Sequence, residues 1–152
     1  FKNKEFNNIN DLENWWEKSK NKKSKNLLDN IPKSLPSMLR AHKIQIKVAK
    51  KGFDYISKSE AVDKVIEEAN ELKKEIKDNN RKKIKEELGD LIFSILDVSR
   101  KLELNPEMIL SKANKKFKKR WKKIENFTKK EKIKLEDLTI NDYNKYWEKA
   151  KN

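Results

Sequence analysis

Apolar residues recur at helical spacing along most of this chain. Such stripes predict four helices, over residues 35–51, 60–77, 82–103 and 106–127, and shorter helices over residues 11–20 and 140–150. The chain has only two glycines and three prolines, fewer turn residues than a β-rich fold needs. We therefore expect an all-α fold of the helical-bundle type.

Cap and turn residues mark the ends of these helices. Pro36 stands in the first turn of one helix and Gly52 just after its end, where a glycine is favoured. Ser59 is the expected N-cap of the next helix. The polar connection 77–81 is short, which makes the helices on either side of it antiparallel neighbours. Residues 1–26 are interpreted as a short helix and a charged linker, and residues 27–152 as one domain.

Two features indicate more apolar surface than one helical hairpin can cover. The helix over residues 35–51 has apolar residues on two faces, and Phe93 points away from the main stripe of its own helix. We therefore expect two chains to pair as a homodimer that completes the bundle.

Composition excludes several classes of chemistry. The chain has no cysteine and a single histidine, His42, so thiolate nucleophiles and Cys- or His-clustered metal sites are excluded. Its longest apolar runs are too short to cross a membrane, and no signal peptide is recognisable. We expect a cytoplasmic protein that does not bind membranes.

The net charge of +14 leaves two interpretations open. A basic surface attracts polyanions, and a helical nucleic-acid-binding domain is the alternative function. Only 4 of the 39 basic residues are arginine, however, and the lysines are spread along the chain. An excess of Lys, Asn and Ile is also typical of a genome rich in A and T. Specific nucleic-acid binding is therefore not expected.

Two acidic motifs lie on the consecutive helices 60–77 and 82–103. Glu68 and Glu71 are three residues apart on the first helix, as are Glu87 and Asp90 on the second, so each pair shares a face. A helical wheel places Glu68 and Glu87 beside the apolar stripes, with Glu71 and Asp90 further out. An antiparallel hairpin could bring the four carboxylates together, although each pair alone could be a solvated acidic face.

Four carboxylates this close need a cation or protons to neutralise them. Oxygen ligands without His or Cys select hard ions, and rigid helices suit the octahedral demand of Mg²⁺, with Mn²⁺ as a substitute. Mg²⁺ held by a few carboxylates is commonly used for phosphate chemistry.

The ordered set of motifs resembles the MazG nucleotide pyrophosphohydrolases, members of the all-α NTP pyrophosphohydrolase superfamily. The resemblance rests on the two acidic motifs and on the segments LLDNIPKSLPSMLRAHKIQIKVAKKGFDY (27–55) and EELGDLIFSILDVSRKLELNPEMILSKANKKFKKRWKKIE (86–125). It covers roughly residues 27–151, so residues 27–152 are similar to the catalytic C-terminal domain of a two-domain MazG protein.

The resemblance implies Mg²⁺-dependent hydrolysis of nucleoside triphosphates to monophosphates and pyrophosphate. It implies that the four acidic residues hold the metal and act in catalysis, namely Glu68, Glu71, Glu87 and Asp90. It further implies that phosphates and base are bound by Lys116, Arg120, Trp147 and Lys151. Asp97 stands where the family leads us to expect Asn and could be an outer ligand or a proton relay. A degenerate MazG domain kept for dimerisation is a further alternative.

Overall fold

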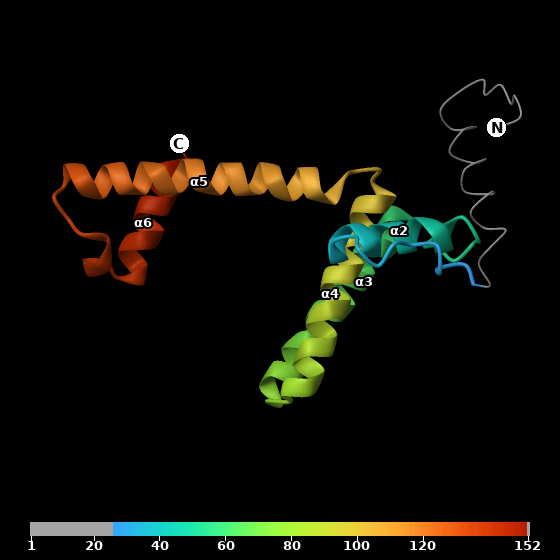
Figure 1. Cartoon of the computed structure of the whole chain (residues 1–152). Coiled ribbons are helices and arrows are strands. Elements are labelled where there is room, and N and C mark those ends of the chain that lie inside the picture. The colour runs from blue at the N-terminus through green and yellow to red at the C-terminus, as the bar shows by residue number, and fades with distance from the viewer. Residues whose placement is uncertain (1–25, 152) are drawn as a thin grey trace, which may run out of the picture. The chain divides into compact units, whose positions relative to one another are not determined.

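All regular elements that the computed structural model describes, within residues 26–151, are helices (Figure 1). They are α2 (Ser37–Ala49), α3 (Lys58–Lys77), α4 (Arg81–Lys101), α5 (Pro106–Lys130), the short 3-10 helix η1 (Leu135–Asp137) and α6 (Ile140–Lys151). The all-α prediction is thus confirmed, and the five helices predicted between residues 35 and 150 are present within a few residues of their expected bounds. The helix predicted over residues 11–20 lies outside the described residues.

The chain divides into two compact units, one ending at Leu104 and the other comprising Asn105–Asn152. In the first unit, α4 packs along α3 and also against α2, and α3 and α4 form the predicted antiparallel hairpin (Figure 1). In the second unit, α6 packs against α5. The domain boundary predicted between residues 26 and 27 falls at the edge of the described residues and stays a prediction.

Helix α2 ends as its sequence predicts. Gly52 has a φ of 89°, and its N–H donates to the carbonyl of Ala49 at 2.9 Å. The next N–H, that of Phe53, donates to the carbonyl of Val48 at 3.1 Å. These paired bonds satisfy carbonyls that the helix itself leaves open.

The start of α3 differs from the prediction. The N-cap is Ser57, whose hydroxyl accepts a hydrogen bond from the Glu60 N–H at 3.1 Å, so Ser59 lies inside the first turn. The prediction of Ser59 as the cap is therefore wrong. Ser57 has Glu60 three residues later, the spacing of a capping box, and this spacing was the available signal.

The α3–α4 hairpin does not bury the stripe that stands out in the sequence. The buried residues of α3 are Ala61, Glu68 and Glu75, which recur every seven residues. Several apolar residues of the stripes are 44–57% exposed instead, namely Val62, Ile66, Ile76, Leu88, Ile92 and Ile95. Most of the apolar stripe is therefore open surface in a single chain.

The second unit has its own small core. Ile124 of α5 is 1% exposed and packs with Tyr146 and Ala150 of α6. Half-buried aromatic and aliphatic side chains surround this cluster. Within the described residues, no helix combines the length and hydropathy needed to span a bilayer.

The N-cap of α3 gives a matched pair of substitutions. Ser57→Ala should lower the free energy of unfolding by about 1 kcal/mol, because the Glu60 N–H loses its acceptor. Ser59→Ala, two residues away, should leave it nearly unchanged. Chemical denaturation measures both, and equal losses in the two variants would contradict the assignment of the cap.

Candidate functional site

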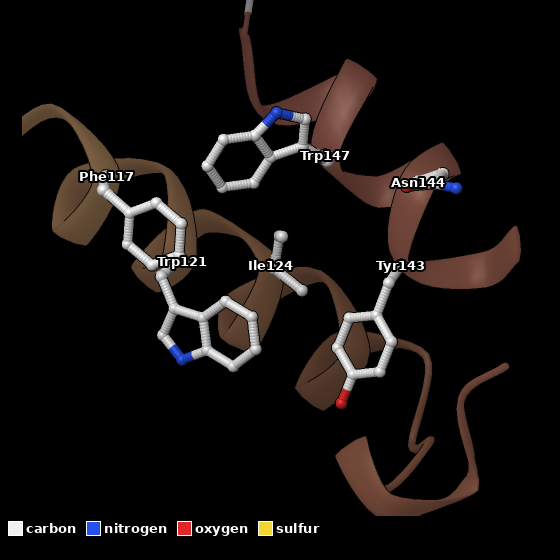
Figure 2. A pocket seen from close by; sticks show the side chains of 6 residues that line it. All are labelled: Phe117, Trp121, Ile124, Tyr143, Asn144 and Trp147. Atoms are coloured by element: carbon white, nitrogen blue, oxygen red, sulfur yellow. The ribbon is translucent and has the colours of Figure 1, made fainter. Parts of the chain in front are cut away.

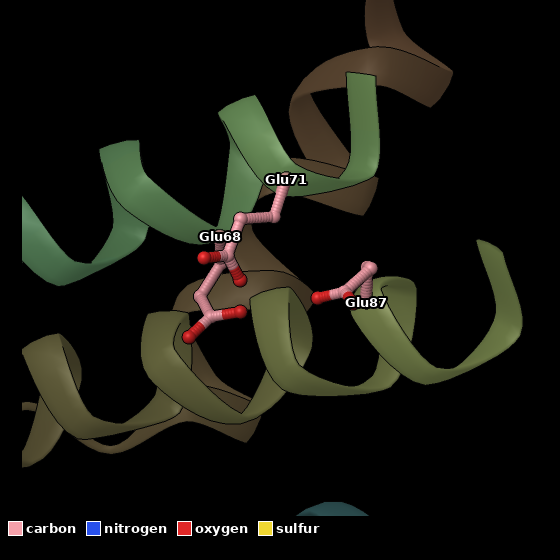
Figure 3. A group of neighbouring side chains, drawn as sticks. All are labelled: Glu68, Glu71 and Glu87. Carbon is pink, nitrogen blue, oxygen red and sulfur yellow. The ribbon is translucent and has the colours of Figure 1, made fainter. Parts of the chain in front are cut away.

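Three carboxylates from two helices meet in the first unit. Glu68 and Glu71 project from α3 and Glu87 from α4, and one oxygen of each lies within 4.8 Å of the others. Figure 3 shows the three side chains turned toward one another between the two helices. Since the connection between α3 and α4 is short, residues far apart in sequence lie opposite each other along the hairpin.

The three carboxylates differ in burial as the helical wheel predicts. Glu68 is 6% exposed because it belongs to the row of α3 that faces α4, whereas Glu87 is half-buried and Glu71 is exposed. A site whose carboxylates differ in burial in this way holds the buried carboxylate rigidly and leaves the outer ones accessible to a ligand from solvent.

Asp90, the fourth predicted ligand, lies outside the group of three. It follows Glu87 by one turn of α4 and is exposed. Its shorter side chain keeps its carboxylate nearer its own helix. Together with Glu68 it lines a cavity beside the three carboxylates. Its role as a ligand stays a prediction.

The cluster carries mutual repulsion that its surroundings only partly relieve. Desolvation, together with the charges of Glu71, Glu68 and Asp90, raises the pKa of Glu87. Across the residues that the structure describes, no ion pair joins Glu71 or Glu87 to a basic side chain. A divalent cation bound by these carboxylates would remove this repulsion.

The buried Glu68 does have a basic partner. Lys64 Nζ lies 2.8 Å from Glu68 and 2.9 Å from Glu67, and these contacts raise the pKa of Lys64. Sequence reasoning missed Lys64, although its spacing of four residues before Glu68 could have indicated the pair. The ammonium group thus compensates the carboxylate that water reaches least.

The cavity beside the carboxylates has a volume of about 340 Å³ and lies entirely in the first unit. Its lining combines acidic and basic side chains with aromatic ones. Its lining includes Gln45, Phe53, Tyr55, Phe93, Asp97 and Arg100. Among these six, the sequence predicted a role at the site for Asp97 alone, and Phe93 was interpreted as surface for pairing.

Asp97 is held by an arginine in the lining of this cavity. Arg100 donates from Nε to Asp97 at 2.5 Å and from Nη2 to Asp54 at 2.5 Å. The Arg100 hydrogen bond lowers the pKa of Asp54 to about 2. Asp97 lies outside the group of three carboxylates. Its predicted part as an outer ligand or relay stays a prediction, and in this structure it helps to fix Arg100.

The remaining predicted residues lie in the second unit. Trp147 is half-buried on α6, packs against the core of that unit and contacts the Phe117 ring at 5.1 Å between centroids. The Arg120 guanidinium lies 5.5 Å from the centre of the Trp147 ring, as a cation–π pair does. Lys116 is exposed, and Lys151 is exposed and paired with Glu148. The structure thus brings Arg120 and Trp147 together.

An aromatic pocket of about 390 Å³ opens beside these residues (Figure 2). Its lining residues are Phe117, Trp121, Ile124, Tyr143, Asn144 and Trp147. Trp121 stacks on Tyr143 and donates its indole N–H to Glu125 at 3.0 Å. This position of Trp147 is compatible with both interpretations of the residue, as a core anchor and as a stacking surface for a base.

Residues 57–125, which include all three clustered carboxylates, match the family described as the MazG nucleotide pyrophosphohydrolase domain. This chain carries a MazG domain. The resemblance stated from the sequence is therefore confirmed.

Curated relatives agree with this assignment. The chain is 40% identical over 132 residues to the nucleoside triphosphate pyrophosphohydrolase/pyrophosphatase MazG of Thermotoga maritima. This match covers 87% of this chain and 51% of the Thermotoga protein. It is 35% identical over 126 residues to the nucleoside triphosphate pyrophosphohydrolase of Escherichia coli K12, covering 82% of this chain and 48% of the relative. The chain thus spans about half the length of these two relatives.

A third relative is longer still. The chain is 36% identical over 156 aligned residues to the uncharacterised protein YabN of Bacillus subtilis, covering 99% of this chain and 32% of YabN. The names of the Thermotoga and Escherichia relatives describe hydrolases.

The raised pKa of Glu87 predicts a linked effect of pH and metal. Because the folded protein disfavours ionised Glu87, stability falls as pH rises through this pKa, and Glu87→Gln removes the loss. At pH 7 in EDTA, Glu87→Gln should therefore melt at a higher temperature than the unmodified protein, with little difference at pH 4. Mg²⁺ should raise the melting temperature of the unmodified protein more than that of Glu87→Gln.

Glu86→Gln is the control for this experiment, because Glu86 is exposed and lies outside the carboxylate group. Glu86→Gln should have the same melting temperature in EDTA as the unmodified protein and the same increase in Mg²⁺. A Glu87→Gln variant that is destabilised in EDTA at pH 7, yet keeps the full response to Mg²⁺, would contradict the metal assignment.

Proposed function

We propose that this chain is a Mg²⁺-dependent nucleoside triphosphate pyrophosphohydrolase of the cytoplasm. It would convert NTPs or dNTPs to NMPs or dNMPs and pyrophosphate by attack of water at the α-phosphorus. The observation that carries this proposal is the group of three carboxylates that α3 and α4 bring within 4.8 Å. The named activities of the Thermotoga and Escherichia relatives support it.

The donor set fits a hard divalent cation, since all three groups are carboxylates whose repulsion is incompletely compensated. Glu68, Glu71 and Glu87 would hold Mg²⁺ or Mn²⁺, and Asp90 would complete the set. When bound, the ion neutralises phosphate charge and makes a coordinated water more acidic. Glu71 and Asp90 are the exposed members, so we assign the proton from the attacking water to one of these two.

The leaving pyrophosphate carries several negative charges, which cations must meet. Helix α5 contains ten basic and two acidic residues, and we propose that Lys116 and Arg120 contact the phosphates from it. Lys151 would add a further contact. Trp147, whose ring already attracts the Arg120 guanidinium, would stack on the base, and stacking favours broad base specificity.

We further propose that two chains pair through the open apolar stripe of α3 and α4. This stripe includes Ile66 and Ile92, which are 54% and 47% exposed, and it runs along both helices of the hairpin. A face this apolar is unfavourable in water, and a second copy presents a stripe of the same length and pattern.

Identifying the products tests the proposed reaction. The protein is incubated with a panel of NTPs and dNTPs in Mg²⁺ or in EDTA, and monophosphate and pyrophosphate are quantified. We expect both products in Mg²⁺ and neither in EDTA. Glu71→Gln should lower kcat about 100-fold or more, because the ion loses a ligand, whereas Glu86→Gln should retain activity.

Two results would count against the reaction. Diphosphate with orthophosphate would show that a different bond is cut. A folded protein that turns over no nucleotide would favour a degenerate MazG domain used for dimerisation, or a basic helical domain that binds nucleic acid.

Light scattering tests the pairing. The unmodified chain should give a mass close to twice the 18.2 kDa of one chain. Ile66→Glu should shift the mass toward one chain, because pairing would bury the new charge without a partner. Asn141→Glu, at an exposed position of α6, should keep the mass of the unmodified protein. An unchanged mass for Ile66→Glu would refute pairing through this stripe.

A further inference from the structure

Gln45, the only glutamine of the chain, is buried with half of its amide unsatisfied. It is 3% exposed, and its Nε2 donates to the carbonyl oxygen of Phe93 on α4 at 2.7 Å. This bond fixes the orientation of the amide, because two carbonyl oxygens cannot pair. The amide oxygen Oε1 is buried and has no hydrogen-bond partner among the described residues.

A buried acceptor of this kind is uncommon, since nearly all buried polar atoms in proteins have a partner. Gln45 lines the cavity beside the carboxylates. Because Oε1 is itself covered, a ligand donor in that cavity would reach it after a small movement of the neighbouring side chains.

The walls of the cavity have two distinct characters. Glu68 and Asp90, which belong to the proposed metal site, line it together with the aromatic residues Phe53, Tyr55 and Phe93. A triphosphate held at the carboxylates would therefore have an aromatic chamber beside it. Flat, partly apolar rings such as nucleobases suit walls of this kind.

Apart from Asp90, which belongs to the proposed metal site, the charged groups that line the cavity have charged partners. Lys64 is bound by Glu68, and Arg100 is bound by Asp54 and Asp97. The open hydrogen-bonding position at Gln45 is thus that of a neutral acceptor, which calls for an N–H or O–H rather than an ion.

We propose that this cavity binds the nucleoside of the triphosphate in place of the Trp147 ring, a proposal that rests on the metal site and the reaction proposed above. The Gln45 Oε1 accepts a hydrogen bond from an N–H of the base or an O–H of the sugar. Gln45 is then a specificity residue in the first unit, separate from the carboxylates that hold the metal.

The test compares ligands with and without a nucleoside. Calorimetry in Mg²⁺ measures the Kd of the full chain for inorganic tripolyphosphate and for the α,β-methylene analogues of ATP, CTP, GTP and UTP, which resist cleavage at that bond. We expect at least one analogue to bind more tightly than tripolyphosphate. Gln45→Leu should weaken that analogue roughly three- to tenfold and leave tripolyphosphate unchanged.

A 2′,3′-dideoxy version of the best analogue distinguishes the two donors. If its affinity remains sensitive to Gln45→Leu, the base supplies the donor; if the sensitivity disappears, a sugar hydroxyl does. Lys43→Ala, an exposed residue of the same helix, is the control and should bind every ligand as the unmodified protein does.

Two results would overturn the inference and leave the metal site intact. One is equal affinity for tripolyphosphate and every analogue, which would mean that water alone satisfies Oε1. The other is an unchanged analogue affinity in Gln45→Leu. Failure to bind both tripolyphosphate and the analogues would instead overturn the proposed function itself.

A second variant covers the case in which Gln45→Leu does not fold. Phe53 lines the cavity but is 81% exposed, so Phe53→Ser should leave the fold intact. It should weaken the best analogue and leave tripolyphosphate unchanged. If Phe53→Ser binds both ligands as before, the aromatic wall does not contact a nucleoside and the inference is wrong.

Discussion

The burial of the Glu68 carboxylate between α3 and α4 is the constraint on which the first unit depends. A buried charge needs a partner, and Lys64 supplies one at 2.8 Å. Glu71 and Glu87 approach the same point without a basic partner in the described part of the chain, and desolvation together with the neighbouring carboxylates raises the pKa of Glu87. The hairpin therefore holds an electrostatic arrangement that a divalent cation would improve. Structural stability and the proposed chemistry thus meet at the same three side chains.

The same constraint explains how the hairpin uses its two faces. The row that α3 turns toward α4 contains Ala61, Glu68 and Glu75, so the helices approach through a small residue and carboxylates. The apolar stripe is left outside, with Ile66 and Ile92 about half exposed. A chain organised in this way gains little from its apolar residues until another surface covers them. Pairing of two chains and formation of the acidic site are therefore linked in the proposed enzyme.

The cavity beside the acidic site can contact a part of the ligand that the carboxylates would not bind. Apart from Asp90, its charged side chains are paired, and the amide oxygen of Gln45 is a buried acceptor with no partner in the described part of the chain. The carboxylates would recognise what all nucleoside triphosphates share, whereas a neutral acceptor beside aromatic rings can respond to the nucleoside. The predicted phosphate and stacking contacts of Arg120 and Trp147, which lie together in the second unit, would be of a less selective kind.

The sequence by itself determined the helices, most of their ends and the acidic motifs, because spacing, caps and i, i+3 pairs are local properties. It also indicated that Glu68 and Glu87 lie closer to the core than Glu71 and Asp90. Only the tertiary structure decided that three of the four carboxylates gather, since side-chain length and the register between helices set that distance. Likewise, the open oxygen of Gln45 depends on the carbonyl of Phe93, 48 residues away. Such contacts join residues distant in the chain, and helical periodicity carries no information about them.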